Sequence, residues 1–379
     1  MSKTLREIAE QLRDANKKVQ MIYAFNGSGK TRLSREFKNL IEADSSSDET
    51  NGDTEHLALS QKHILYYSAF TEDLFYWDND LSGDEERKLK IHPNSFTNWV
   101  FKEQGQDQNV IDNFQHYTDK KLTPHFNENF SEVSFSFERG NEERTENIKI
   151  SKGEESNFIW SIFYSLIEQV INVLNVAEPG DRETDQFDQM EYIFIDDPVS
   201  SLDENHLIEL AVNLAELIKS SQSELKFVIT THNPLFYNVL YNELSLNKKG
   251  KREGCYLLEC LEDGTFNLDV KYGDSNKSFS YHLYLKQIIE KAVAENQIQK
   301  YHFTLLRNLY EKTANFLGYQ KWSELLPDDK QVYLNRIIQF TSHSTLSNEA
   351  IAEPTELEKQ TVKFLLDNLI DNYNFWKQV

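Results

Sequence analysis

The glycine-rich stretch at residues 24–31 contains the first residues whose types and spacing could do chemistry. Its sequence, Ala-Phe-Asn-Gly-Ser-Gly-Lys-Thr, lies between an apolar run at residues 19–22 and a helical pattern at residues 32–41. Glycines at a strand-to-helix turn let backbone N–H groups surround phosphate oxygens, while the lysine reaches the outer phosphates and the threonine hydroxyl binds Mg²⁺. The stretch therefore predicts a site for ATP or GTP with Mg²⁺, formed by Asn26, Gly27, Ser28, Gly29, Lys30 and Thr31.

Ala24 stands where this motif normally has its first glycine. Alanine can take the position if its φ angle stays negative there. The alternative is a glycine-rich turn that only begins a helix. The intact Gly-Ser-Gly-Lys-Thr that follows favours the phosphate site.

Two aspartates end an apolar run at residues 192–195, and a histidine ends a second such run at residues 226–231. A carboxylate at a strand end can hold Mg²⁺, and a second can orient an attacking water. We assign Asp196 to the metal, Asp197 to the water and His232 to sensing the γ-phosphate. ABC-type ATPases usually carry glutamate at the second position. The shorter side chain of Asp197 therefore predicts slow turnover.

A third group with chemical potential lies in the last third of the chain. Arg307 and Glu311 are four residues apart, which places them on one helix face, and His343 follows in a polar loop. Cleavage of RNA through attack by its own ribose 2′-OH needs a base, an acid and a guanidinium, and it needs no metal. The alternative is a surface ion pair and an unrelated loop histidine.

The elements that must position the first two groups follow a recognisable order. Residues 150–155, Ile-Ser-Lys-Gly-Glu-Glu, match the Leu-Ser-Gly-Gly-Gln signature of ABC-type ATPases at Ser151 and Gly153, with Glu154 next. Residues 199–203 resemble the loop that follows the acidic strand in those enzymes and end at Asp203. Five motifs in this order predict an α/β ABC-type ATPase domain with a phosphate loop. In that superfamily the signature closes over nucleotide on another subunit, so a homodimer is expected.

The rest of the chain suggests two domains. We expect an ATPase domain over residues 1–265, with a flexible acidic insertion at 42–58, and a mostly α-helical domain over residues 266–379. Helical segments are expected at about 280–295, 301–316, 329–340 and 356–376. Residues 67–80 combine aromatic and acidic side chains, which fits either a contact surface or an aromatic core with an acidic rim.

Composition limits the partners. The net charge of −22 lies entirely in residues 1–270, because residues 271–379 carry 13 basic and 13 acidic side chains. An acidic ATPase region argues against wrapping nucleic acid. The most apolar segment, residues 157–177, is interrupted by polar side chains and predicts a buried helix, not a membrane span. The N-terminus lacks a signal-peptide pattern, and Cys255 and Cys260 fit reduced core residues of a cytoplasmic protein.

With these motifs in view, the chain resembles the bacterial anticodon nuclease family PrrC over essentially its whole length. The resemblance rests on residues 24–31, 67–80, 150–155 and 196–203. In the C-terminal region it rests on Lys-Tyr-Gly-Asp-Ser-Asn-Lys at residues 271–277, Leu-Arg-Asn-Leu-Tyr-Glu-Lys at residues 306–312 and Phe-Thr-Ser-His-Ser at residues 340–344.

The resemblance implies a nuclease that cleaves tRNA(Lys) 5′ to the wobble base and leaves a 2′,3′-cyclic phosphate and a 5′-OH. Arg307, Glu311 and His343 match the family's proposed catalytic triad, and Asp274 lies in a segment implicated in anticodon recognition. The family also implies an antiphage role, a latent state held by a type I restriction–modification complex, release by a phage peptide, and control by GTP and dTTP.

Two classes of function therefore remain open at this stage. One is a nucleotide-gated tRNA nuclease, and the other is an ABC-type regulatory or DNA-repair ATPase whose C-terminal helices only bind a partner. The acid and base roles of Glu311 and His343 are also interchangeable on this evidence.

Overall fold

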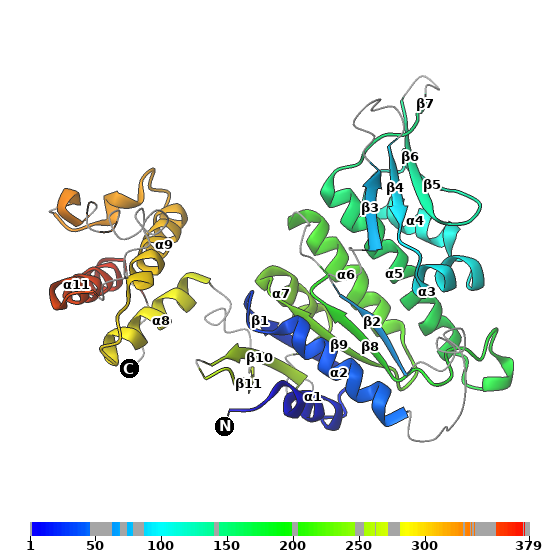
Figure 1. The fold of residues 1–379 in the computed structure, drawn as a ribbon, viewed down its shortest axis with the longest axis horizontal. Coiled ribbons are helices and arrows are strands. Elements are labelled where there is room, and N and C mark those ends of the chain that lie inside the picture. The colour runs from blue at the N-terminus through cyan, green and yellow to red at the C-terminus, as the bar shows by residue number, and fades with distance from the viewer. Residues whose placement is uncertain are drawn as a thin grey trace. The chain divides into compact units, whose positions relative to one another are not determined.

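The apolar runs that precede the phosphate-site motifs become neighbouring strands of one sheet in the computed structural model of the chain (Figure 1). The strands are β1 (Val19–Ala24), β2 (Ile64–Tyr67), β8 (Tyr192–Asp196), β9 (Lys226–Thr231), β10 (Cys255–Cys260) and β11 (Phe266–Val270). Their order is β11-β10-β1-β9-β8-β2, and every pair is parallel except β10 with β11. Parallel strands end at the same edge of a sheet, so β1, β8 and β9 deliver their last residues to one place.

Helices cover both faces of this sheet, which is why its central strands are almost continuously apolar. Helices α1 (Leu5–Asp14) and α2 (Lys30–Ser45) bury Leu12 and Phe37 against Ile22 and Phe194. Helix α7 (Pro234–Glu243) packs on the other face, where Tyr237 contacts Tyr23 with ring centroids 6.0 Å apart. Helix α6 (Glu204–Ser220) lies beside α7. The α/β domain expected from the motifs is therefore present.

A second, antiparallel sheet has the order β3-β4-β6-β5, with β7 paired to β6. Its strands are β3 (Phe75–Asp78), β4 (Lys88–Ile91), β5 (Leu122–Phe126), β6 (Glu132–Glu138) and β7 (Arg144–Thr145). The helical elements between residues 95 and 181 of the chain are α3 (Ser95–Asn98), η3 (Trp99–Glu103), α4 (Asp107–Tyr117), α5 (Lys152–Leu174) and η4 (Pro179–Asp181). Phe158 of α5 meets Phe135 of β6 with ring centroids 5.3 Å apart.

This region shows what the described part of the aromatic and acidic segment at residues 67–80 does. Tyr67 is buried against Trp160 and Phe163, with centroid distances of 5.4 and 4.9 Å. Phe75 is buried as well, whereas Tyr76 is 46 % exposed. The described residues thus fit the aromatic-core alternative better than a continuous contact surface.

Helix α5 is long and apolar enough to cross a membrane by length and composition alone. Its apolar window has a mean hydropathy of 1.2, and 78 % of that window is buried inside the protein. Burial of this extent is that of a core helix, as the interrupting polar residues predicted.

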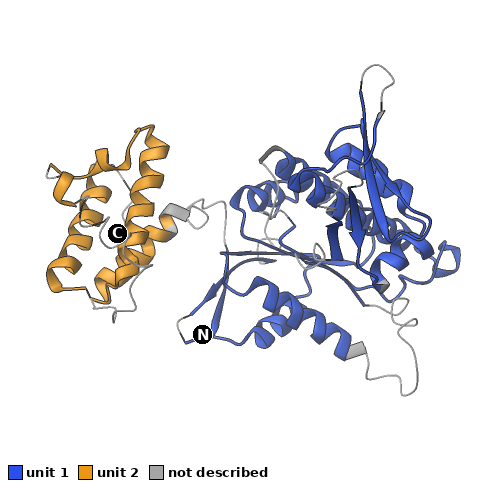
Figure 2. Ribbon diagram, turned by 45° about the horizontal axis from the view of Figure 1, so that its top comes forward, with its two compact units in different colours: residues 1–274 blue, residues 275–379 orange. Residues whose placement is uncertain are grey.

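The chain divides into two compact units, Met1–Asp274 and Ser275–Val379 (Figure 2). The expected boundary at residue 265 was therefore too early, because β11 completes the first sheet by pairing with β10. The structure describes residues 2–45, 63–68, 74–78, 87–139, 144–198, 204–246, 254–261, 263–271, 281–328, 330–333, 335, 337, 354–373 and 375.

The expected insertion at residues 42–58 also begins too early. Helix α2 runs to Ser45, and Glu42 forms an i,i+4 ion pair with Lys38 at 3.7 Å. Residues 46–58 lie outside the described part. Cys255 is buried as expected, but Cys260 is exposed.

The second unit is helical, as the sequence indicated. Its elements are α8 (Tyr281–Ala294), α9 (Lys300–Leu317), η7 (Trp322–Leu325) and α11 (Glu356–Asn372). Buried side chains such as Phe303, Leu306 and Leu366 form its core. The Tyr310 hydroxyl donates to the Leu365 carbonyl at 2.8 Å, which joins α9 to α11.

A close backbone contact fixes the start of β10 beside β1. A Cβ atom at Gly254 would lie 2.5 Å from the backbone oxygen of Val19, which is too close for any side chain. We expect Gly254→Ala to lower the free energy of unfolding by about 1–3 kcal/mol, the usual cost of overpacking. Gly180→Ala is the control, since nothing lies within 4 Å of its added methyl group. Equal denaturant midpoints for the two variants would contradict this packing.

A buried lysine follows β11 directly. The ammonium of Lys271 lies 5.6 and 5.9 Å from the ring centroids of Tyr23 and Tyr237. Burial lowers the pKa of Lys271 to about 7, against the smaller opposing influence of Cys255.

This lowered pKa predicts a specific dependence of stability on pH. Between pH 7 and 10 the unfolded chain holds a proton on Lys271 that the folded chain has largely released. The penalty of burying this lysine therefore falls, and the unfolding free energy rises, as the pH increases. The unfolding free energy of the wild type should therefore rise relative to that of Lys271→Met across this range. Denaturant titrations of both proteins test this, with Lys120→Met at an exposed turn as the reference for losing one lysine. Parallel curves for wild type and Lys271→Met would contradict the prediction.

Candidate functional site

The loop between β1 and α2 has the backbone of a phosphate cradle. Gly27 and Gly29 have φ angles of +82° and +92°, which favour glycine. The Ser28 N–H donates to the Phe25 carbonyl at 3.2 Å, and α2 begins at Lys30. Ala24 is not among the residues with positive φ, so alanine takes the first motif position without strain.

Lys30 is 7 % exposed and points back into this loop. Its ammonium donates to the carbonyls of Ala24 and Phe25 at 3.2 and 3.3 Å and to Asn26 Oδ1 at 3.2 Å. It also lies 3.5 Å from Asp197 Oδ2. The strand-end acid and the loop lysine are thus neighbours, as the parallel sheet requires.

Asp196 is 1 % exposed and sits at the end of β8. It accepts hydrogen bonds from Thr230 Oγ1 at 2.6 Å and Ser34 Oγ at 3.3 Å, and the Thr31 side chain is a further partner. Burial raises the pKa of Asp196 despite these bonds. A carboxylate kept beside the loop threonine can share a cation with it, and Thr31 and Asp196 stay the predicted Mg²⁺ ligands.

Asp197 has a left-handed backbone, with a φ of +54°. Its Oδ2 lies 2.6 Å from His232 Nδ1, and its Oδ1 accepts from the His232 N–H at 3.3 Å. Burial acts to raise the pKa of Asp197, but the hydrogen bonds and charge of His232 and the charge of Lys30 outweigh it and lower the pKa. The ionised carboxylate is therefore held beside the cradle.

These residues fit a nucleotide with Mg²⁺ by their chemistry. Two glycines with positive φ angles direct backbone N–H groups toward a ligand at a helix N-terminus, and Lys30 and Thr31 follow directly. The ATPase-type domain expected from the sequence motifs calls for such a group. Lys30 would meet the outer phosphates, Thr31 and Asp196 would hold the cation, and Asp197 and His232 lie beside them. The group would supply the phosphoanhydride bond that such domains hydrolyse.

The signature segment lies at the start of α5. Ser151 is the N-cap, and its N–H donates to Glu154 Oε2 at 2.7 Å while the Glu154 N–H donates to Ser151 Oγ at 3.2 Å. Ser151 is exposed and Gly153 is partly exposed. Asp203, the last residue of the following loop motif, lies outside the described residues.

Arg307 and Glu311 form an ion pair on α9 in the second unit. Arg307 Nε lies 2.8 Å from Glu311 Oε1, and the side chains are 38 % and 34 % exposed. The Arg307 guanidinium also lies 5.9 Å from the ring centroid of Trp322. His343 and Asp274 lie outside the described residues, so the structure brings together two members of the expected catalytic group.

Sequence reasoning missed three residues of these sites. Thr230 and Ser34 hydrogen-bond Asp196, and Trp322 borders the Arg307 guanidinium. Thr230 is the β9 residue paired with Asp196 in the parallel register, a pairing that only the folded sheet reveals. Ser34 lies one turn after Lys30, which also placed it on the inner face of α2.

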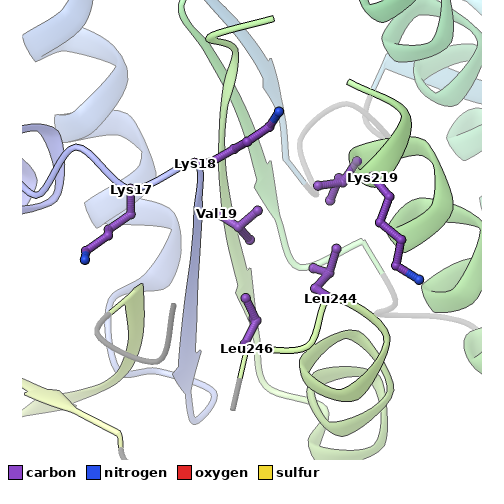
Figure 3. A pocket seen from close by; sticks show the side chains of 7 residues that line it. Lys17, Lys18, Val19, Lys219, Leu244 and Leu246 are labelled. Atoms are coloured by element: carbon purple, nitrogen blue, oxygen red, sulfur yellow. The ribbon is translucent and has the colours of Figure 1, made fainter. Parts of the chain in front are cut away.

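A cavity of about 290 Å³ lies where β1 begins, at the opposite end of that strand from the cradle (Figure 3). Val19, Leu244 and Leu246 give it an apolar wall, while Lys17 and Lys219 extend outward on opposite sides. Lys219 pairs with Glu243 at 3.0 Å. This cavity is therefore separate from the nucleotide site.

The cradle predicts that nucleotide binding depends on Lys30. We expect Lys30→Ala to weaken binding of a fluorescent nucleotide with Mg²⁺ at least tenfold, because the outer phosphates lose their buried cation. Lys38→Ala, on the surface of the same helix, is the matched control. Unchanged affinity in Lys30→Ala, measured by equilibrium titration, would contradict the assignment.

Comparison with known proteins supplies the family. The family model described as an AAA domain matches residues 115–366, which include Ser151, Asp196, Asp197, His232 and Arg307. Solved structures of an Smc head bound to the C-winged helix domain of ScpA and of the Thermotoga maritima SMC head are also similar. Their TM-scores are 0.34 and 0.31 at 11 % and 12 % identity, covering 69 % and 68 % of this chain and 92 % and 91 % of those chains.

A full-length relative gives the clearer match. It is the anticodon nuclease of Escherichia coli, 65 % identical over 397 residues, with 100 % of this chain and 99 % of that protein covered. An identity of this size over both whole chains includes the ATPase-type unit and the helical unit alike. The chain therefore belongs to the anticodon nuclease family and is an enzyme with an AAA-type ATPase domain.

Proposed function

We propose that this protein is a nucleotide-gated endoribonuclease that cleaves tRNA(Lys) in its anticodon loop, 5′ to the wobble base. The products would be a 2′,3′-cyclic phosphate and a 5′-OH. The observation that carries the proposal is the Arg307–Glu311 pair, held at 2.8 Å on a helix face that is open to solvent. The family of the chain supports tRNA as the substrate class.

The chemistry of these side chains suits attack by the ribose 2′-OH. A planar guanidinium can stabilise negative charge that builds on the phosphate, and a carboxylate beside it can accept or return a proton. His343 would be the second proton-transfer group. We favour Glu311 as base and His343 as acid, and the reversed roles use the same atoms. This route needs no metal at the nuclease site, since the nucleophile belongs to the RNA itself.

Asp274 is proposed to take part in recognising the anticodon. It is the last residue of the first unit, directly before the helical unit begins. Single-stranded loops with exposed bases are the usual targets of sequence-specific RNA binding. A carboxylate can accept hydrogen bonds from base amino groups.

Control of the nuclease is proposed to come from the ATPase-type unit acting as a homodimer or larger homo-oligomer. The exposed N-terminal turn of α5 would place Ser151, Gly153 and Glu154 against nucleotide held by Lys30 of a second copy. Asp203 would join the same interface. Asp197 would orient the attacking water and His232 would sense the γ-phosphate, and the short Asp197 suits slow hydrolysis.

The setting proposed for this enzyme is antiphage defence in the cytoplasm. The protein would be kept latent by a type I restriction–modification complex and released by a phage-encoded peptide. ATP or GTP would occupy the cradle, and dTTP would act as a regulator. These partners follow from the family resemblance, which spans residues 24–31 and 306–312 among other segments.

Cleavage of total tRNA by the full-length protein tests this function. The protein is first loaded with nucleotide and Mg²⁺, free divalent metal is then chelated, and RNA ends are sequenced. We expect one cut in tRNA(Lys) with a cyclic phosphate end. His343→Ala should reduce the rate by about 10²–10⁴-fold, the usual range for acid–base groups. Arg307→Ala should reduce it by about 10²–10³-fold, the usual effect of losing a donor that stabilises developing charge.

Lys312→Ala is the matched control, because it removes an exposed charge from the same helix. Full cleavage by both Arg307→Ala and His343→Ala would refute the site. ATP hydrolysis without any tRNA cut would instead favour a regulatory or DNA-repair ATPase.

A further inference from the structure

We propose that a cavity beside the Arg307–Glu311 pair holds a nucleobase of the RNA next to the scissile bond, and that Trp322 stacks on this base. The inference rests on the proposed RNA cleavage and extends it to the recognition of the substrate. It makes Trp322 a positioning residue, separate from the groups that transfer protons.

The cavity is lined by one member of the proposed catalytic pair, Glu311. Its volume is about 370 Å³, within the range of small-ligand pockets, which is about 300–1,000 Å³. The residues that line it come from α9, from the segment that connects it to η7, and from the start of η7: Glu311, Asn315, Gln320, Lys321, Trp322 and Ser323. Since Glu311 belongs to both the cavity and the ion pair, an occupant lies within reach of the reacting groups.

Trp322 is held in place by two neighbours. Its ring meets Tyr310 edge to face at a centroid distance of 6.3 Å, and the Arg307 guanidinium lies 5.9 Å from its centroid. Tyr310 is fully buried and hydrogen-bonded to α11, so the indole rests on the core of the unit. Trp322 itself remains partly exposed and borders the cavity. A partly exposed aromatic ring held at the edge of a cavity is what unstacked RNA bases use as a platform.

The remaining lining is polar, and its chemistry fits a base edge. Asn315 and Gln320 are exposed amides, each able to donate and accept hydrogen bonds. Such amides pair with the donor and acceptor pattern of a nucleobase. Lys321 supplies a cation that suits an adjoining phosphate. An apolar peptide side chain would find one aromatic ring and five polar neighbours, which makes a base the better occupant.

The test uses full-length protein and three synthetic anticodon stem–loops. One stem–loop is intact, and the other two carry a ribose without a base on the 5′ or the 3′ side of the scissile phosphate. Single-turnover kcat/KM is measured for wild type, Trp322→Ala, Trp322→Phe and Phe316→Ala. Phe316 is the control aromatic on α9, since it is 84 % exposed and is not among the residues lining the cavity.

We expect Trp322→Ala to lose about 5- to 150-fold in kcat/KM on the intact loop, the effect of one stacked base. On one of the two base-free loops, wild type and Trp322→Ala should cleave equally, because the partner of the indole is gone. Trp322→Phe should keep most of the activity, and Phe316→Ala all of it. Equality on one base-free loop also identifies which base enters the cavity.

A loss in Trp322→Ala that is the same on all three loops would show a structural role and overturn the inference. Full activity of Trp322→Ala on the intact loop would overturn it too. Both outcomes leave the proposed function standing as long as Arg307→Ala reduces cleavage as predicted. Absence of cleavage of the intact loop by the wild type would instead refute the proposed function.

Discussion

The carboxylate of Asp197, between the His232 imidazole and the Lys30 ammonium, is the interaction on which the ATPase-type unit depends. It lies 2.6 Å from His232 Nδ1 and 3.5 Å from the Lys30 ammonium, in a left-handed backbone that costs energy for a residue with a Cβ. Only the parallel arrangement of β1, β8 and β9 brings these three residues to one edge. The sheet topology and the contacts of the Asp197 carboxylate therefore define the same site.

Much of this site was readable from the sequence because its motifs are local. The phosphate cradle needs glycines at fixed positions before Lys30, and the acidic pair must end an apolar strand, so both are visible in short windows. The helical character of the last third was readable for the same reason. The hydrogen bonds of Asp196 to Thr230 and Ser34 join segments far apart in the chain, and the strand register places them.

Other features needed the fold itself. The boundary between the units lies after β11, because an antiparallel strand without strong patterning still completes the first sheet. The place of Trp322 beside Arg307 depends on how α9 and η7 pack, and a tryptophan in isolation reads as core. His343, Asp203 and Asp274 stay sequence predictions, since they lie outside the described residues.

The proposed function couples the nucleotide cradle of the first unit to the nuclease chemistry of the second. Under this proposal, occupancy of the cradle decides when Arg307 and Glu311 act. The most direct measurement is single-turnover cleavage of an anticodon stem–loop by the full-length protein across a nucleotide titration, with bound nucleotide measured in parallel. We predict that the cleavage rate changes with the amount of bound nucleotide and that the two titration curves have the same midpoint. A cleavage rate that is the same without nucleotide and at saturation would contradict it.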